Sequence, residues 1–187
     1  DPQGLHVVPF KKPTTEELDH DFLWRVHKEV PAKGQIAIFN RSHYEDIIAV
    51  RVKKIFPDPV WKRRYKHVLD FEAMLAEEGT VIIKLFLNIS KAEQKKRLES
   101  RLQDPDKLWK FCMDDLDDRN RWDEFQTAYQ DLIEKTSTPE APWYIIPADR
   151  KWYRNLVVAR LMVEKLRHLQ LSLPTPNFDP ASIIIPD

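Results

Sequence analysis

The sequence of 187 residues is poor in several features, and each shortage excludes a class of protein. Cys112 is the only cysteine, so no internal disulfide can form, as is typical of a reducing compartment. No stretch approaches the ~18 apolar residues of a membrane span, and no signal peptide is visible. We therefore expect a cytoplasmic protein with no membrane partner.

Net charge is also absent, because 30 basic side chains balance 30 acidic ones. Since nucleic-acid surfaces depend on excess positive charge, this balance argues against a nucleic-acid partner. The three glycines are too far apart to form a glycine-rich loop that wraps phosphate with backbone N–H groups. Neighbouring side chains in Asp19-His20-Asp21 point in different directions on a helix, so we expect no metal site in this sequence.

The sequence contains an alternation of strand and helix patterns. Apolar runs predict strands at 7–10, 36–39, 80–88 and 143–146, and the run at 80–88 suggests burial on both faces. Helices are expected at 14–29, 42–55, 60–78, 90–102 and 150–169, with a charged helical segment at 104–136 and an extended, proline-rich tail at 174–187. Thr14 and Glu17 match a capping box at the start of the first helix, and Asp149 can cap the last. The alternation favours one domain, residues 1–187, with a three-layer α/β/α fold and a parallel sheet.

Residues 39–46, Phe-Asn-Arg-Ser-His-Tyr-Glu-Asp, form the first candidate site. Asn40 and Arg41 fall at the C-terminal end of a strand, where ligands bind in open α/β sheets. An arginine there, close to a helix N-terminus, is suited to holding phosphate. A purely structural interpretation is also open, because Ser42 and Glu45 match a capping box and Arg41 could pair with Asp46.

The charged segment 107–122 is the second candidate site. Basic side chains on helices that cover a phosphate group would neutralise charge and exclude water. The alternative is a solvated helix face with internal ion pairs, such as Lys110 with Asp114 at i,i+4. The cations of this segment are Lys107, Lys110, Arg119 and Arg121.

With both features considered, the sequence resembles the family-2 polyphosphate kinases, which have a P-loop kinase fold like that of thymidylate kinase. The resemblance extends over nearly all of the sequence, and Phe-Asn-Arg-Ser-x-Tyr is its most specific motif. It is carried by the segments Phe10–Pro13, Glu17–Arg25, Gly34–Asp46, Trp122–Phe125 and Ala141–Tyr153.

The resemblance implies reversible transfer of the terminal phosphoryl group of inorganic polyphosphate to a nucleotide, with Mg²⁺. His43-Tyr44-Glu45-Asp46 is similar to the subgroup that accepts nucleoside monophosphates as well as diphosphates, so AMP and ADP are the expected acceptors and ATP a product; guanine nucleotides are further candidates. A homo-oligomer is also expected. By position, Asn40 and Arg41 would contact phosphates, Lys12, Arg25 and Glu45 would lie on the nucleotide side, and Lys107, Lys110, Arg119 and Arg121 would belong to a helical lid, residues 104–136, over polyphosphate.

One departure from the family pattern leaves alternatives open. The family carries a phosphate loop, Gly-x-Asp-x-x-Gly-Lys-Asp, ahead of the region that corresponds to Asp1, and its aspartate would help to hold Mg²⁺. We therefore expect this chain to be a fragment that lacks the loop and its strand, and to have little kinase activity alone. An ATP-dependent nucleotide kinase and a non-catalytic polyanion- or nucleotide-binding module remain alternatives.

Overall fold

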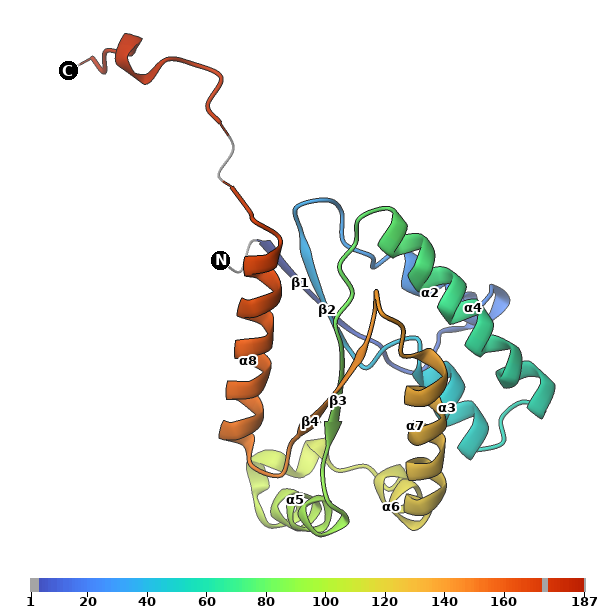
Figure 1. Cartoon of the computed structure of the whole chain (residues 1–187). Helices are drawn as coiled ribbons and strands as arrows, with labels where there is room; N and C mark the ends of the chain where they lie inside the picture. Colours follow the sequence, from blue (N-terminus) through green and yellow to red (C-terminus); the bar gives the residue numbers. More distant parts are fainter. Residues whose placement is uncertain (1–3, 173–174, 187) are drawn as a thin grey trace. The chain divides into compact units, whose positions relative to one another are not determined.

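The computed structural model describes residues 4–172 and 175–186, in which strands and helices alternate along the chain (Figure 1). The strands are β1 (Leu5–Pro9), β2 (Ile36–Asn40), β3 (Lys84–Asn88) and β4 (Trp143–Pro147). The α-helices are α1 (Thr15–Asp19), α2 (Trp24–His27), α3 (Glu45–Val52), α4 (Asp58–Glu77), α5 (Lys91–Gln103), α6 (Asp114–Asn120), α7 (Trp122–Thr136) and α8 (Lys151–His168). Two 3-10 helices are η2 (Pro105–Lys110) and η3 (Pro180–Ser182).

The strands pair as β1 with β2 and β3 with β4. The first pair is parallel, in a register that runs from Leu5 opposite Ile36 to Pro9 opposite Asn40, which confirms the parallel pairing expected from the sequence. In the described residues the four strands form two two-stranded sheets rather than one. The expected burial of β3 on both faces is therefore not seen: Lys84 is 5% exposed, but Leu87 is 46% exposed.

The main apolar core lies among α3, α4 and α7, which are neighbours in space (Figure 1). Ile47 and Ile48 of α3, Val68 of α4 and Ala128 and Leu132 of α7 are almost completely buried there. A second, smaller cluster joins β1 and α2 to α4 through Val8, Phe10, Val26 and Phe71. The start of α3 is therefore held by the main core, and Phe39 of β2 packs against the second cluster.

Local capping explains why some helix ends were predictable. Thr14 and Glu17 form a reciprocal capping box, as expected. Ser90 caps α5 by accepting the Glu93 N–H. Gly79 ends α4 at a positive φ of 91°, the left-handed conformation that glycine adopts without steric cost.

Three predictions about helix boundaries and caps were wrong. The helix expected at 14–29 is broken into α1 and α2, because the Asp21 side chain accepts the Leu23 N–H at 2.9 Å and competes with the helical backbone pattern. The helix expected from Ser42 begins at Glu45, and the Ser42 hydroxyl accepts the Tyr44 N–H at 3.4 Å instead of forming a capping box. The N-cap of α8 is Arg150 rather than the expected Asp149.

The described chain divides into two compact units, Asp1–Phe86 with Ser90–Ile145, and Leu87–Ile89 with Ile146–Asp187. The residues of the candidate sites all belong to the first unit. The second unit contains α8 and the tail. Residues 175–186 contain one short 3-10 turn, η3, and otherwise no helix or strand. Pro174 and Asp187, the two ends of the expected extended tail, lie outside the described residues.

Candidate functional site

Arg41, in the turn after β2, has an unusual backbone conformation. Asn40 is the last residue of β2, and its carbonyl oxygen accepts the Phe10 N–H at 3.1 Å. Arg41 then adopts φ = 61°, in the left-handed region, at a cost of about 1–2 kcal/mol for a residue with a side chain. Its side chain is exposed. Strain of this kind persists where the surrounding structure enforces it, and it is concentrated at functional sites.

Electrostatic contacts connect this turn to the charged segment. Burial raises the pKa of the Glu45 carboxyl group; the nearby Arg41 charge opposes the rise, and the Asp118 charge adds to it. Burial also raises the pKa of the Tyr129 hydroxyl on α7, and the Glu45 charge contributes to that rise. The Lys53 Nζ atom lies 2.7 Å from Asp118 Oδ1 in an ion pair. The start of α3 therefore shares one electrostatic environment with α6 and α7.

The simple structural explanation for Arg41 is not what the structure shows. Asp46, its expected partner, instead accepts a hydrogen bond from Arg25 at 3.0 Å. Arg41 forms no ion pair with any residue in the ranges 4–172 and 175–186. Its guanidinium thus remains available to an anion, and its charge, like that of Lys53, acts to lower the pKa of Glu45.

The three side chains predicted to lie on the nucleotide side differ in their availability. Lys12 is exposed. Arg25 is only 8% exposed and donates to the Lys11 carbonyl oxygen at 2.9 Å as well as to Asp46, so its contacts are internal. Glu45 is half-buried beside Arg41. The charges of Arg41 and Glu45 influence each other, whereas Arg25 joins α2 to α3.

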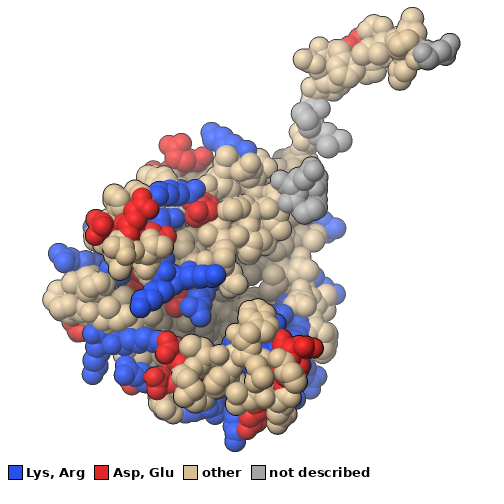
Figure 2. Space-filling view, turned by 180° about the vertical axis from the view of Figure 1, so that it is seen from behind, with Lys and Arg blue, Asp and Glu red and all other residues tan. Residues whose placement is uncertain are grey.

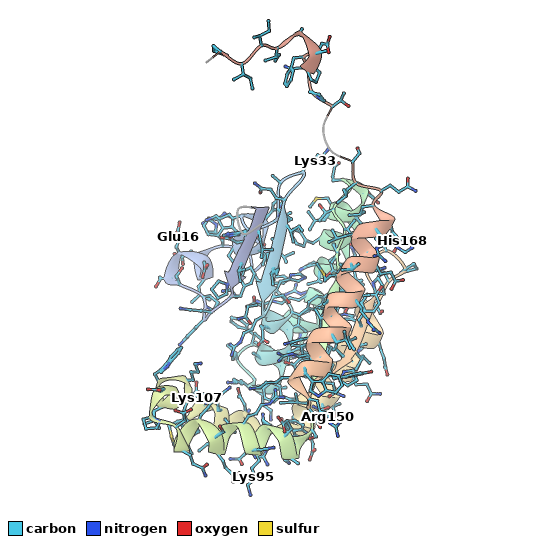
Figure 3. All side chains as sticks on the ribbon, turned by 90° about the vertical axis from the view of Figure 1, so that its left-hand side faces the viewer. Glu16, Lys33, Lys95, Lys107, Arg150 and His168 are labelled. Carbon is cyan, nitrogen blue, oxygen red and sulfur yellow. The ribbon has the colours of Figure 1, made fainter. Side chains whose placement is uncertain are left out.

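The four predicted lid cations make four separate contacts rather than one cluster. Lys107 pairs with Asp104 within its own turn, and Lys110 lies over the Trp109 ring at 4.9 Å rather than pairing with Asp114. Figure 3 shows Lys107 on the helical segment that follows α5.

The other two lid cations reach different helices. Arg119 donates to the Lys91 carbonyl oxygen at 2.7 Å and to Gln94 at 2.9 Å, both on α5. Arg121 donates to the Val52 carbonyl oxygen at 2.8 Å, at the end of α3. Of the four, Arg121 therefore contacts the helix that Glu45 begins.

The two parts of the segment 104–136 differ in burial. The helix α7 supplies Ala128 and Leu132 to the core. Residues 105–120 carry η2 and α6 and contain no buried side chain. The part of the segment that precedes α7 is therefore less buried than α7 itself.

Sequence reasoning missed a buried polar network that is joined to the turn after β2 through His43 and Tyr44. Glu72 of α4 accepts a hydrogen bond from the Tyr44 hydroxyl at 2.6 Å and one from the Lys84 ammonium at 2.7 Å. Lys84 also donates to the Tyr44 hydroxyl at 3.1 Å and to the Thr136 carbonyl oxygen at 2.6 Å. His43 Nε2 lies 3.4 Å from Glu72. The available signal was a lysine inside an apolar strand, because such a charge needs a partner.

This network predicts an acid-dependent loss of stability. Burial alone would raise the pKa of Glu72, but the contacts with His43, Lys84 and Tyr44 hold the pKa of this carboxyl below its ordinary value of 4.5. As pH falls below 4.5, the unfolded chain takes up the proton first, so the stabilisation is complete above that pH and is lost on acidification. We expect the urea concentration at the unfolding midpoint to decrease as the pH is lowered below 4.5.

The matched variant Glu72→Gln should flatten this part of the pH profile while lowering the midpoint at pH 7. The exposed variant Glu77→Gln should leave the profile as it is. If the urea midpoint of Glu72→Gln decreases with acidification as steeply as that of the unsubstituted protein, other carboxyl groups cause the loss of stability.

Two further searches concern metals and membranes. Within residues 4–172 and 175–186, no three His, Cys, Asp or Glu side chains come close enough together to hold a metal ion. In the same residues, none of the helices has the length and apolar content needed to cross a bilayer.

Comparisons with known proteins agree on one family. The family model described as polyphosphate kinase 2 matches residues 1–173. An "AMP/ADP-polyphosphate phosphotransferase" of Meiothermus ruber is 53% identical, over 98% of this chain and 69% of the relative. An "ADP-polyphosphate phosphotransferase" of Rhodopseudomonas palustris is 40% identical, over 92% of this chain and 64% of the relative.

The solved structures give the same result. The crystal structure of polyphosphate kinase 2 from Arthrobacter aurescens TC1 superposes with a TM-score of 0.94 at 49% identity, covering 97% of this chain and 64% of that one. The predicted α/β, P-loop kinase-like fold is thereby confirmed. The chain spans about two thirds of the length of these relatives. On the evidence of the Asn-Arg-Ser turn, the fold and the match over residues 1–173, this chain belongs to the polyphosphate kinase 2 family.

Proposed function

We propose that the protein transfers the terminal phosphoryl group of inorganic polyphosphate to AMP and ADP, reversibly and with Mg²⁺. The names of the similar proteins support both acceptors, since they include an AMP/ADP-polyphosphate phosphotransferase and a polyphosphate:AMP phosphotransferase of Pseudomonas syringae. The observation that carries the proposal is Arg41, which has no ion pair with any described residue and is held in a strained turn where a strand ends.

The chemistry needs charge and placement rather than a protein nucleophile. Phosphoryl transfer passes through a state whose negative charge is spread over the phosphate oxygens, and a rigid guanidinium can stabilise that charge with two parallel hydrogen bonds. In the proposed role, Arg41 binds the phosphates together with the Asn40 side chain, and Mg²⁺ neutralises further charge when it is bound. Lys12 and Glu45 contact the acceptor, Arg25 supports that side of the site, and Lys107, Lys110, Arg119 and Arg121 contact the polyphosphate donor.

A comparison of donors tests the proposal directly. The full-length protein that carries this chain is expected to make ADP and ATP from polyphosphate and AMP in the presence of Mg²⁺, and to do so faster than it makes ADP from ATP and AMP. A rate with ATP that exceeds the rate with polyphosphate would identify an ordinary nucleotide kinase. Binding of polyphosphate without turnover by any donor would identify a non-catalytic module.

The choice of acceptor provides a second prediction. The Glu45 carboxyl lies beside Arg41, and a negative charge there repels ADP, with its extra phosphate, more than AMP. Glu45→Gln is therefore expected to lower the ratio of kcat/KM for AMP to that for ADP by about tenfold. Separate initial rates with AMP and with ADP measure this ratio.

The control for this prediction is Glu77→Gln, which removes an exposed carboxyl from α4 far along the sequence from the turn. It should leave the ratio unchanged. A ratio that stays constant in Glu45→Gln as well would remove Glu45 from the acceptor site.

Three further parts of the proposal concern the protein's surroundings. We propose a homo-oligomer, which is supported by exposed apolar side chains on α8, such as Trp152 at 63% and Val163 at 47%.

A cytoplasmic location is supported by the free, exposed Cys112. Figure 2 shows Lys and Arg interspersed with Asp and Glu on the face that is drawn, which supports the absence of a nucleic-acid partner. Guanine nucleotides are acceptors to include in the assay.

A further inference from the structure

The Tyr44 hydroxyl is the point at which several separate elements are joined. Tyr44 precedes the first residue of α3, and its hydroxyl contacts Glu72 of α4 and Lys84 of β3. Lys84 continues the connection to the Thr136 carbonyl oxygen at the end of α7. All four residues are buried, at 0–5% exposure, and belong to the same compact unit. The base of the turn is thus attached to three elements that are distant in sequence.

The strained residue Arg41 lies only three positions before this attachment. On its other side, Asn40 is held by the hydrogen bond from Phe10 and by the pairing of β2 with β1. A left-handed conformation at a residue with a Cβ relaxes unless both flanks are fixed. The β1–β2 pair fixes one flank, and Tyr44 fixes the other.

The Tyr44 hydroxyl is not needed to neutralise the buried charges. Lys84 contacts Glu72 directly at 2.7 Å, and this ion pair does not pass through the tyrosine. The Tyr44 ring already packs in the apolar core and against Trp143, with ring centroids 4.9 Å apart. The hydroxyl adds hydrogen bonds that fix the position of Tyr44 relative to the Glu72–Lys84 ion pair.

We propose that Tyr44, Glu72 and Lys84 are positioning residues that hold the turn 41–44 and thereby aim the Arg41 guanidinium at the transferring phosphate. This inference rests on the proposed function, because it assigns a role to Arg41 in phosphoryl transfer. It adds a set of residues, from α4 and β3, that do not touch the substrate. A displacement of about 1 Å at a group that contacts the reacting atoms is enough to cost up to ~10²-fold in rate.

A double-substitution cycle between Tyr44 and Arg41 tests the inference in the full-length protein. Tyr44→Phe keeps the ring in place and removes only the hydroxyl, so the protein should fold. We expect it to lower kcat for polyphosphate and AMP by about tenfold, with a smaller change in KM. In an Arg41→Ala background the same change should have less than a twofold effect, because the group that Tyr44 aims is gone.

Two comparisons separate positioning from general stability. Val68→Ala removes a fully buried side chain from the same helix as Glu72 and should lower the melting temperature more than Tyr44→Phe does, yet leave kcat within about twofold at a temperature where the protein is folded. Glu72→Gln should resemble Tyr44→Phe in its dependence on Arg41.

The outcomes distinguish the inference from the function on which it rests. Turnover that needs Arg41, combined with losses from Tyr44→Phe and Arg41→Ala that simply multiply, would overturn the inference alone. A kcat for Val68→Ala that falls as far as that for Tyr44→Phe at equal stability would also overturn it. An absence of polyphosphate-dependent turnover in the unsubstituted protein would instead overturn the proposed function.

Discussion

Replacing Arg41 with alanine is expected to lower kcat for transfer from polyphosphate to AMP by about 10³-fold. The guanidinium has no ion pair with a described residue, so its charge is free to meet the charge that develops on the transferring phosphate. Removing an interaction made mainly in the transition state should lower kcat and kcat/KM together and change KM little. Initial rates of ADP formation over a range of AMP concentrations measure both parameters.

Two companion variants separate the guanidinium from the backbone strain. Arg41→Gly relieves the positive φ and should raise the free energy of unfolding by about 1 kcal/mol, yet be as inactive as Arg41→Ala. Arg41→Lys retains the charge without the two-pronged geometry and should recover part of the rate. Arg63→Ala, at an exposed position of α4, is the control for loss of a positive charge. Activity of Arg41→Ala close to that of the Arg63→Ala control would exclude Arg41 from the reaction.

The elements that sequence reasoning located correctly are those whose signals are local. The capping box at Thr14 depends on residues three apart, and the strand at 36–40 on an apolar run followed by a polar turn. The placement of Arg41 at the end of a strand followed from the same run. The identification of the family depended on short motifs, which are local in the same sense.

The errors arise where contacts between distant residues override a local pattern. Ser42 and Glu45 match a capping box, but the turn is set by Tyr44, which is held by Glu72, 28 residues away, and through it by Lys84. The lid cations Arg119 and Arg121 were grouped because they are close in sequence, although they reach different helices. No periodicity along the chain encodes either outcome.

The pair Glu72–Lys84 also illustrates why the buried network escaped prediction. Glu72 belongs to a long helix and Lys84 to a short strand, with the chain turning at Gly79 between them. Each charge alone at its position would be costly, and only their proximity makes the arrangement stable. The network therefore contributes to stability as a unit, and that property can be measured independently of activity.

Replacing Glu72 alone with alanine is expected to lower the free energy of unfolding by about 3–5 kcal/mol, because it leaves the Lys84 ammonium buried without its counter-charge. The corresponding fall in melting temperature is roughly 6–20 °C for a domain of this size. Urea unfolding at pH 7 measures the free energy, and the exposed variant Glu77→Ala should stay within about 0.5 kcal/mol of the unsubstituted protein.

The combined variant Tyr44→Phe, Glu72→Met, Lys84→Met replaces every interacting group of the trio with an apolar one of similar size. It should lose less than half as much stability as Glu72→Ala, since no unpaired charge remains in the interior. The same variant should have the low kcat of Tyr44→Phe, because the turn that carries Arg41 has lost its attachment. If the combined variant is less stable than Glu72→Ala, the ion pair makes a net favourable contribution to folding. The cost of Glu72→Ala would then not come only from the unpaired Lys84 charge that it leaves in the interior.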